Sequence, residues 1–285
     1  MAKPTDLDQA KTISTGQSTE DIREAAIEPF HGVDEIANRI LDTKSIRHRT
    51  LLHHHATSPP TFDQGLELTR AISAKVEQNF TVILNQAKFT KSQENWRLVS
   101  PGTECAPKNR AREVGLERAM VAACQAQGRA DWWNQVPVAS GLIGGRAGRK
   151  RAIDLVHHRG CSAYDLVELK IGSDTPVYAA VEILEYGLLW LYSRQARMQL
   201  GYTEKNLLDA DEIGLSVLAP HAFYGNADYQ AFGEGIAAAL GEIGGAHDVR
   251  FGFRFAHYPS DFLWTGEAEN AYLCEILDTL YPGPG

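Results

Sequence analysis

The feature that most constrains this chain is a pair of short apolar runs that each carry a carboxylate. One run is Val167–Ile171, with Glu168 and Lys170 at alternate positions, and the other is Ala152–Val156, with Asp154 at its centre. Successive side chains on a strand point to opposite faces, so Glu168 and Lys170 share one face. If the two runs pair as neighbouring strands, Asp154 and Glu168 come close enough to hold one divalent cation, with Lys170 beside it.

Asp165 is a competing candidate for the metal-binding acid because it is closer to Glu168 in the sequence. Alternation places Asp165 on the face of Leu169, opposite to Glu168 and Lys170. The pattern therefore favours Asp165 as a strand-entry or turn residue. The polar connection between the two strands is predicted over His157–Ser162.

A further acid for this site comes from residues 109–127, which have the periodicity of a helix. Glu113 and Glu117 fall inside the apolar stripe of that helix. Acids inside such a stripe are costly unless they are paired. Two interpretations stay open: one of the two acids turns toward the metal, or both lie at the margin of the stripe and pair with arginines. The arginines in reach are Arg110, Arg112 and Arg118.

The layout of Asp154 and Glu168-Leu169-Lys170 resembles the PD-(D/E)xK nuclease superfamily, also called the restriction-endonuclease-like fold. The elements of that family follow the order helix, strand, Asp-bearing strand, Glu-x-Lys strand, long helix, strand. Residues 109–258 can be assigned in the same order. Ile153 stands where the Pro of the motif would be, so the sequence departs from the family at that letter.

The resemblance implies an α/β core with a central mixed sheet flanked by helices, and a Mg²⁺-dependent nuclease in which Mn²⁺ would also serve. It assigns Asp154, Glu168 and the carbonyl of Leu169 to the metal, and Lys170 to the attacking water. An acid on the first core helix often completes such a site, which would give one of the two helix acids a role. The expected substrate is nucleic acid, with DNA favoured over RNA.

Residues 140–151 are rich in glycine and then in cations. Their spacing fits neither a phosphate-binding loop nor a dinucleotide-binding loop, so a turn between two strands is predicted. The cations lie just before Asp154, where they would attract a phosphate backbone, unless they only form a solvated loop. These candidate phosphate-binding residues are Arg146, Arg149, Lys150 and Arg151.

The rest of the core alternates helices and strands. A strongly apolar helix is predicted over 176–200, and its apolar stretches are too short to span a membrane. Glu182 and Glu185, on the same side as Tyr186, are expected to make salt bridges or sheet-edge contacts, unless they lie near the site, where the resembled family sometimes uses polar residues of this helix. Strands are predicted over 213–219 and 249–255, and the remaining helices over 229–243 and 265–280. This alternation predicts a mixed sheet, because the central strands form a hairpin.

Residues 1–105 are predicted to form a mainly helical N-terminal extension, and residues 106–285 the α/β core. Within the extension we expect helices over 33–41 and 62–74 and a hairpin built from 79–87 and 96–100. Three consecutive histidines, His53, His54 and His55, cannot all face one metal from a regular element, so they are interpreted as a polar surface cluster.

Composition limits the function. The net charge of −8 argues against a general DNA-binding protein, because non-specific affinity comes mostly from cations that neutralise phosphates. The four cysteines, spread over positions 105–274, favour reduced thiols, and the lack of a leader-like start favours the cytoplasm. The alternative function is a non-catalytic module of the same fold that binds nucleic acid or protein. A homo-oligomer or a protein partner would suit an acidic surface with exposed aromatic residues, which we expect to include Trp132, Trp133 and Tyr224.

Overall fold

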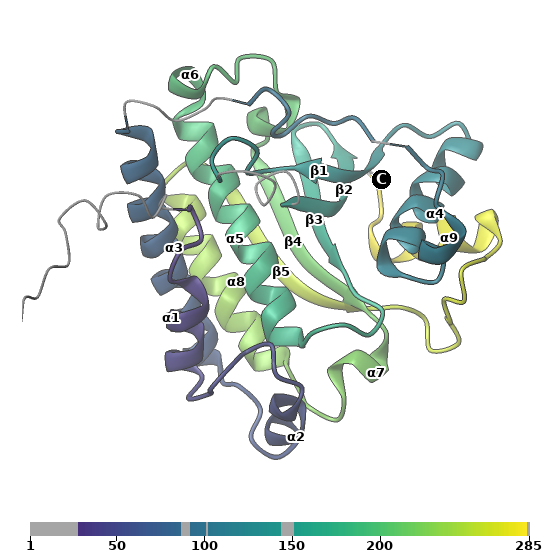
Figure 1. Ribbon diagram of the computed structural model, residues 1–285, viewed down its shortest axis with the longest axis horizontal. Helices are drawn as coiled ribbons and strands as arrows, with labels where there is room; N and C mark the ends of the chain where they lie inside the picture. The colour runs from purple at the N-terminus through teal and green to yellow at the C-terminus, as the bar shows by residue number, and fades with distance from the viewer. Residues whose placement is uncertain (1–27, 87–91, 101, 144–150, 284–285) are drawn as a thin grey trace, which may run out of the picture.

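A five-stranded mixed sheet forms the centre of the protein (Figure 1). The computed structural model describes residues 28–86, 92–100, 102–143 and 151–283. The strand order follows the chain, with β1 to β3 antiparallel and β3 to β5 parallel, which confirms the predicted mixed sheet. The strands are β1 (Trp132–Pro137), β2 (Ala152–Gly160), β3 (Ala163–Leu169), β4 (Glu212–Ala219) and β5 (Arg250–His257).

The two strands that carry the candidate acids are neighbours. β2 and β3 pair antiparallel with Leu155 opposite Val167, and continuing this register places Asp154 opposite Glu168. Only Cys161 and Ser162 separate β2 from β3, so the connection is shorter than the predicted polar segment. Toward the turn both strands are longer than predicted, because each finds partners on both sides, whereas β3 ends at Leu169 and not at the predicted Ile171.

Helices cover both faces of the sheet (Figure 1). One face carries the larger hydrophobic core, and the other carries a separate smaller core built around Leu116, Val167 and Leu277. The helices of the first layer are α1 (Val33–Ile40), α3 (Phe62–Leu84), α5 (Pro176–Gln195) and α8 (Gln230–Gly245). The helices of the second layer are α4 (Glu113–Ala126) and α9 (Asn270–Leu280).

The N-terminal helices share the larger core with the sheet. Leu68 and Phe80 of α3 belong to the same buried cluster as Leu184 and Trp190 of α5. α3 and α8 cross so closely at Gly65 that a Cβ atom on this residue would collide with the backbone of α8. The predicted boundary near residue 105 therefore separates two segments of sequence that pack into one core.

Several boundaries differ from the predictions because tertiary packing overrides local propensity. α3 continues to Leu84, so residues 79–84 are helical and the predicted hairpin with 96–100 does not form; no strand covers 96–100. The predicted helix over 109–127 is a 3₁₀ turn at Pro107–Asn109 followed by α4. The predicted helix over 176–200 breaks at Ala196 into α5 and α6 (Arg197–Leu200).

The histidine cluster is only partly a surface feature. α2 (Thr50–Thr57) carries all three residues, and His53 and His54 are exposed. His55 is buried, and its Nδ1 lies 3.0 Å from the hydroxyl of Tyr229. The remaining short elements are α7 (His221–Tyr224) and a 3₁₀ turn at Asn206–Asp209. The expectation of exposed aromatic residues is wrong for Trp132 and Tyr224, which are buried in the two cores, and Trp133 is half-buried.

Among the described residues, we find no helix with the length and apolar character needed to cross a membrane.

Candidate functional site

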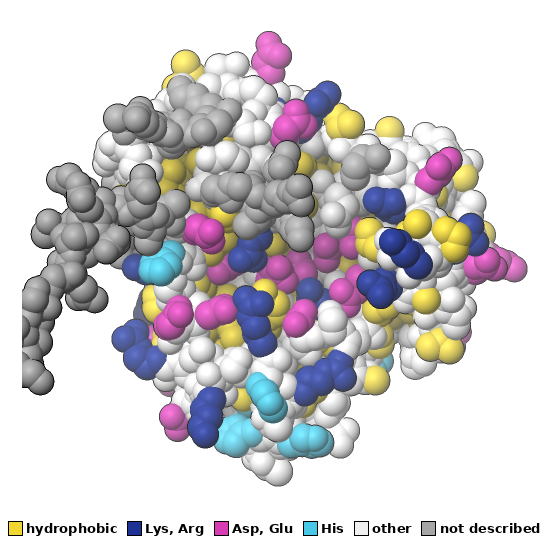
Figure 2. All heavy atoms as spheres, in the orientation of Figure 1, with side chains coloured by type: hydrophobic (Ala, Val, Ile, Leu, Met, Phe, Trp, Pro, Cys, Tyr) yellow, Lys and Arg dark blue, Asp and Glu magenta, His cyan; other side chains and the backbone are white. Residues whose placement is uncertain are grey.

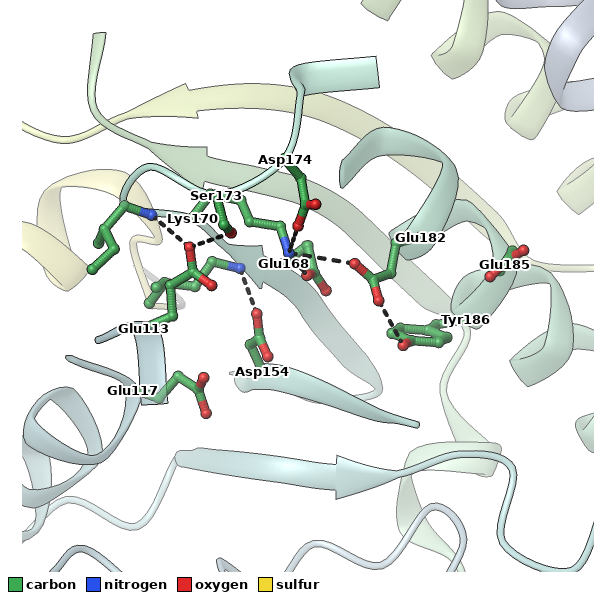
Figure 3. A network of polar contacts seen from close by, with 12 residues as sticks. Glu113, Glu117, Asp154, Glu168, Lys170, Ser173, Asp174, Glu182, Glu185 and Tyr186 are labelled. Atoms are coloured by element: carbon green, nitrogen blue, oxygen red, sulfur yellow. Dashed lines mark hydrogen bonds and ion pairs between the residues drawn. The ribbon is translucent and has the colours of Figure 1, made fainter. Parts of the chain in front are cut away.

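Four elements bring the predicted acids together (Figure 3). β2 supplies Asp154, β3 supplies Glu168, and Lys170 follows β3 directly. α4 supplies two glutamates from one side, and α5 adds another from the opposite side. We call the following residues the acid cluster: Glu113, Glu117, Asp154, Glu168, Glu182 and the cation Lys170.

Lys170 is the buried cation of the acid cluster. Its Nζ atom lies 2.7 Å from Glu168 Oε1 and 3.3 Å from Glu182 Oε2, and the side chain is 7% exposed. Asp174, which has a left-handed backbone with φ of 58°, lies 3.8 Å away. Glu168 and Lys170 thus share one face, as predicted, and their side-chain ends are in contact.

Asp154 lies beside the end of β3. Its Oδ2 atom accepts a hydrogen bond of 2.9 Å from the backbone N–H of Leu169. The N–H and C=O of one residue in an extended strand point to the same side, so the carbonyl of Leu169 is expected to face Asp154 as well. The carboxylate of Asp154 and the predicted carbonyl ligand therefore belong to one small region.

Both helix acids turn toward this region and away from the arginines. Glu113 Oε1 accepts hydrogen bonds from the backbone N–H of Ile171 at 3.1 Å and from the hydroxyl of Ser173 at 2.8 Å. Glu117 is 2% exposed and accepts a hydrogen bond from the side chain of Gln135. Among the described residues, no ion pair joins either glutamate to an arginine, so the pairing interpretation is wrong. Figure 3 shows Glu117 and Asp154 on adjacent elements.

Burial and mutual repulsion disturb the ionisation of the acid cluster. Burial and the charge of Asp154 raise the pKa of Glu117 to about 9. Burial and the charges of Asp154 and Glu182 raise the pKa of Glu168. Burial raises the pKa of Asp154 to about 7, although Lys170 acts to lower it. The cluster holds more carboxyl groups than its one lysine can compensate, so these three acids favour the protonated form more than free carboxyl groups do.

Burial and neighbouring charges oppose each other at Glu182 and at Lys170. Burial acts to raise the pKa of Glu182, but Lys170 and Arg151 outweigh it and lower the pKa. Burial acts to lower the pKa of Lys170, but Glu168 and the other carboxylates raise it. Lys170 therefore remains an ammonium group, which can donate hydrogen bonds but cannot accept a proton.

The predicted phosphate-binding segment is only partly within view. Arg146, Arg149 and Lys150 lie outside the described residues. Arg151 turns toward α5, with its Nη1 3.8 Å from Glu182 and 3.9 Å from Glu185. This pairing agrees with the salt bridges expected for the acids of α5. Figure 2 shows acidic side chains near the middle of this face with basic ones among them.

Asp165 occupies the other face of β3, as the alternation predicts. It is buried within β3, close to its start, and its Oδ2 lies 3.2 Å from Arg159 and 3.3 Å from His157. Arg159 in turn lies 2.7 Å from Glu212. We call Asp165, His157, Arg159, Glu212 and Arg250 the Asp165 cluster.

The donor set suits the Mg²⁺ ion that the resemblance implies. Carboxylate and carbonyl oxygens are the ligands of this hard cation, which uses one or two protein carboxylates and keeps several waters. Asp154, Glu168 and the carbonyl of Leu169 are such a set; burial, followed by repulsion from neighbouring carboxylates, raises the pKa of both acids. Within the described ranges, no group of three or more His, Cys, Asp or Glu side chains is arranged closely enough to hold a metal ion by itself.

Sequence reasoning missed Gln135 and underrated Glu182. Gln135 has a left-handed backbone with φ of 53° and lies between the β1 residues that pair with Ile153 and Leu155, so it falls opposite Asp154. Such strain in a non-glycine residue is frequent at functional sites, but no local signal in the sequence announces it. For Glu182 the signal was its place on α5, on the same side as Tyr186, whose hydroxyl donates to it at 3.2 Å.

Comparisons with protein-family models, with curated proteins and with solved structures found no significant match to this chain.

Proposed function

We propose that this protein is a metal-dependent nuclease of the PD-(D/E)xK type, acting on phosphodiester bonds of nucleic acid. The observation that carries the proposal is the convergence of Asp154, Glu168 and Lys170 at the ends of two paired strands. The order of elements from α4 to β4 adds support, because it is the order that the resemblance implies. DNA is the preferred substrate in this proposal.

Asp154, Glu168 and the carbonyl of Leu169 would hold Mg²⁺. When bound, the ion would supply Lewis acidity and a more acidic water molecule. The backbone N–H of Leu169 holds Asp154, Gln135 holds Glu117 on the α4 side, and Glu113 fixes the backbone after β3 through Ile171. These contacts preorganise the carboxylates before substrate arrives.

Lys170 would orient the attacking water and stabilise charge on the phosphate. Its raised pKa keeps it cationic, so it acts by donating hydrogen bonds and by its charge. In the described structure its ammonium group contacts Glu168 and Glu182. From this position Lys170 would donate to the attacking water, while Glu168 would hold the cation.

Cleavage of labelled oligonucleotides with and without Mg²⁺ tests the proposal. The variant Asp154→Asn keeps the shape of the side chain and removes its charge, so we expect it to abolish Mg²⁺-dependent cleavage. Asp165→Asn is the matched control, because it changes the same residue type on the opposite face of the hairpin. Cleavage by Asp154→Asn at the rate of the unmodified protein would exclude the mechanism.

Metal-induced stabilisation separates a nuclease from a non-catalytic module of the same fold. A ligand that binds only the folded state raises the melting temperature by mass action. We expect Mg²⁺ or Mn²⁺ to stabilise the unmodified protein and Asp165→Asn, but not Asp154→Asn. A binding module would show no stabilisation that depends on Asp154.

A further inference from the structure

A cavity of about 530 Å³ opens where the three parallel strands end. The segments that leave β3, β4 and β5 each line it, through Ile171, His221 and Pro259. In open α/β sheets, ligands bind outside the carboxyl ends of the parallel strands. The volume lies within the range of small-ligand sites. We call this space the strand-end cavity.

The strand-end cavity adjoins the acid cluster along the chain. Ile171, which lines the cavity, follows Lys170 directly, and its backbone N–H donates to Glu113. The backbone that lines the cavity is therefore fixed by an acid of the cluster, and the next residue toward β3 is Lys170.

Flat and apolar side chains line the cavity. His221 is exposed and stacks on His257 with ring centroids 4.2 Å apart and an angle of 8° between the planes, which leaves its other face uncovered by His257. The indole N–H of Trp264 donates to the carbonyl of Arg110 at 2.8 Å, which anchors the ring. Leu263 is 77% exposed. Stacking surfaces of this kind bind nucleobases without regard to sequence.

Exposed cations lie on the segment that anchors Trp264. Lys108, Arg110 and Arg112 are all exposed there, and Arg110 lies 3.6 Å from Glu267. No ion pair among the described residues involves Lys108 or Arg112, so both charges can face phosphate groups. Figure 2 shows basic side chains gathered beside apolar ones over α4. Cations beside aromatic platforms are the combination that single strands require.

We propose that the strand-end cavity binds unpaired bases of a nucleic-acid strand whose backbone passes the acid cluster. This inference rests on the proposed nuclease function and deepens it, because it makes single strands and frayed ends the preferred substrate. In a duplex the bases are stacked and paired, so they reach such a cavity only after they are extruded.

Binding can be measured apart from cleavage by fluorescence anisotropy in EDTA. The probes are a labelled oligothymidylate of about 12 nucleotides, its uridylate counterpart, and a hairpin duplex. The variants are Leu263→Ser and His221→Ala, which change exposed side chains of the cavity. Met198→Ser is the control, because Met198 is 76% exposed and lies on α6, outside the cavity lining.

We expect the unmodified protein to bind a single strand more tightly than the duplex. Each cavity variant should weaken single-strand binding roughly fivefold to tenfold, and Met198→Ser should leave it unchanged. The two single-stranded probes distinguish a DNA strand from an RNA strand as the source of the bases. Absence of single-strand binding, or equal binding by both cavity variants and the unmodified protein, would overturn the inference.

Failure of the nuclease proposal would look different. In that case single-strand binding would depend on Leu263 and His221, while Mg²⁺ would produce no cleavage by the unmodified protein. Conversely, cleavage that depends on Asp154 but shows no effect of the cavity variants on strand preference would overturn only the cavity inference.

Discussion

The hairpin of β2 and β3 carries two charged clusters on its opposite faces, and they differ in how charge is balanced. In the Asp165 cluster, hydrogen bonds from Arg250 and Arg159 lower the pKa of Glu212. In the acid cluster, burial raises the pKa of Asp154 and of Glu168. The same two strands thus carry the Asp165 cluster, in which acids pair with arginines, and the acid cluster, in which the carboxyl groups outnumber the one lysine. The acid cluster is the better candidate for binding a cation.

The largest difference should appear when each cluster loses a cation. Lys170→Met leaves Glu168 and Glu182 without their partner, so we expect it to lower the free energy of unfolding by about 3 to 5 kcal/mol at pH 8. Arg159→Met should cost less, because Glu212 keeps its contact with Arg250. Denaturant unfolding measures both. Equal losses would break the comparison. The cost also means that removal of Lys170 does not leave the stability intact, so Asp154 is the cleaner position for activity tests.

The pH dependence of stability should carry the signature of the acid cluster. The pKa of Asp154 is about 7 and that of Glu117 about 9 in the folded protein, both above the values of unfolded chains. The folded state then binds more protons than the unfolded state between these pKa values. The stabilisation by proton binding is therefore complete below about pH 4 and is lost as pH rises toward and through the folded-state pKa values of Asp154 and Glu117.

We therefore expect the metal-free protein to lose several kcal/mol of stability between about pH 5 and pH 8 through this cluster. The measurement is denaturant unfolding at a series of pH values. The double variant Asp154→Asn with Glu117→Gln should show a flatter profile than the unmodified protein. An unchanged slope in the double variant would show that other groups cause the dependence.

Neutralising one aspartate in each cluster should change stability in opposite directions. At pH 8 without metal, Asp154→Asn removes a destabilising charge and should raise the free energy of unfolding by about 1 to 2 kcal/mol. Asp165→Asn removes the partner of Arg159 and should lower it by a similar amount. Thermal and denaturant unfolding would both report the sign. A loss of stability in Asp154→Asn would contradict the charge imbalance.

The smallest effect is expected at the rim of the Asp165 cluster. Arg250 is 76% exposed in its side chain and its partner Glu212 also contacts Arg159. Exposed ion pairs contribute little, so Arg250→Ala should change the free energy of unfolding by less than about 1 kcal/mol. A larger loss in denaturant unfolding would mean that the Asp165 cluster acts as one cooperative unit.

The faces of the strands were predictable from sequence, because period-two alternation depends only on the geometry of the backbone. Asp165 and Glu168 separated as expected for this reason. The mixed sheet followed from the order of strand-like and helix-like segments. The element order around the site could therefore be read before any contact was known.

What sequence could not provide depends on contacts between distant segments. α3 extends to Leu84 because it packs along α8 and α5, whereas local propensity had suggested a strand near Asn79. The burial of His55 depends on Tyr229, far along the chain. The left-handed backbone of Gln135 is held by the surrounding sheet, and no single residue type encodes it.

The central claim is that Asp154 and Glu168 bind a divalent metal, and a crystal soaked in Mn²⁺ tests it most directly. Anomalous density reports the position of the ion without assuming any activity. The account predicts a peak within ligand distance of both carboxylates, and its loss in a crystal of Asp154→Asn. A Mn²⁺-soaked crystal without a peak at these two residues, or with a peak only elsewhere on the chain, would contradict it.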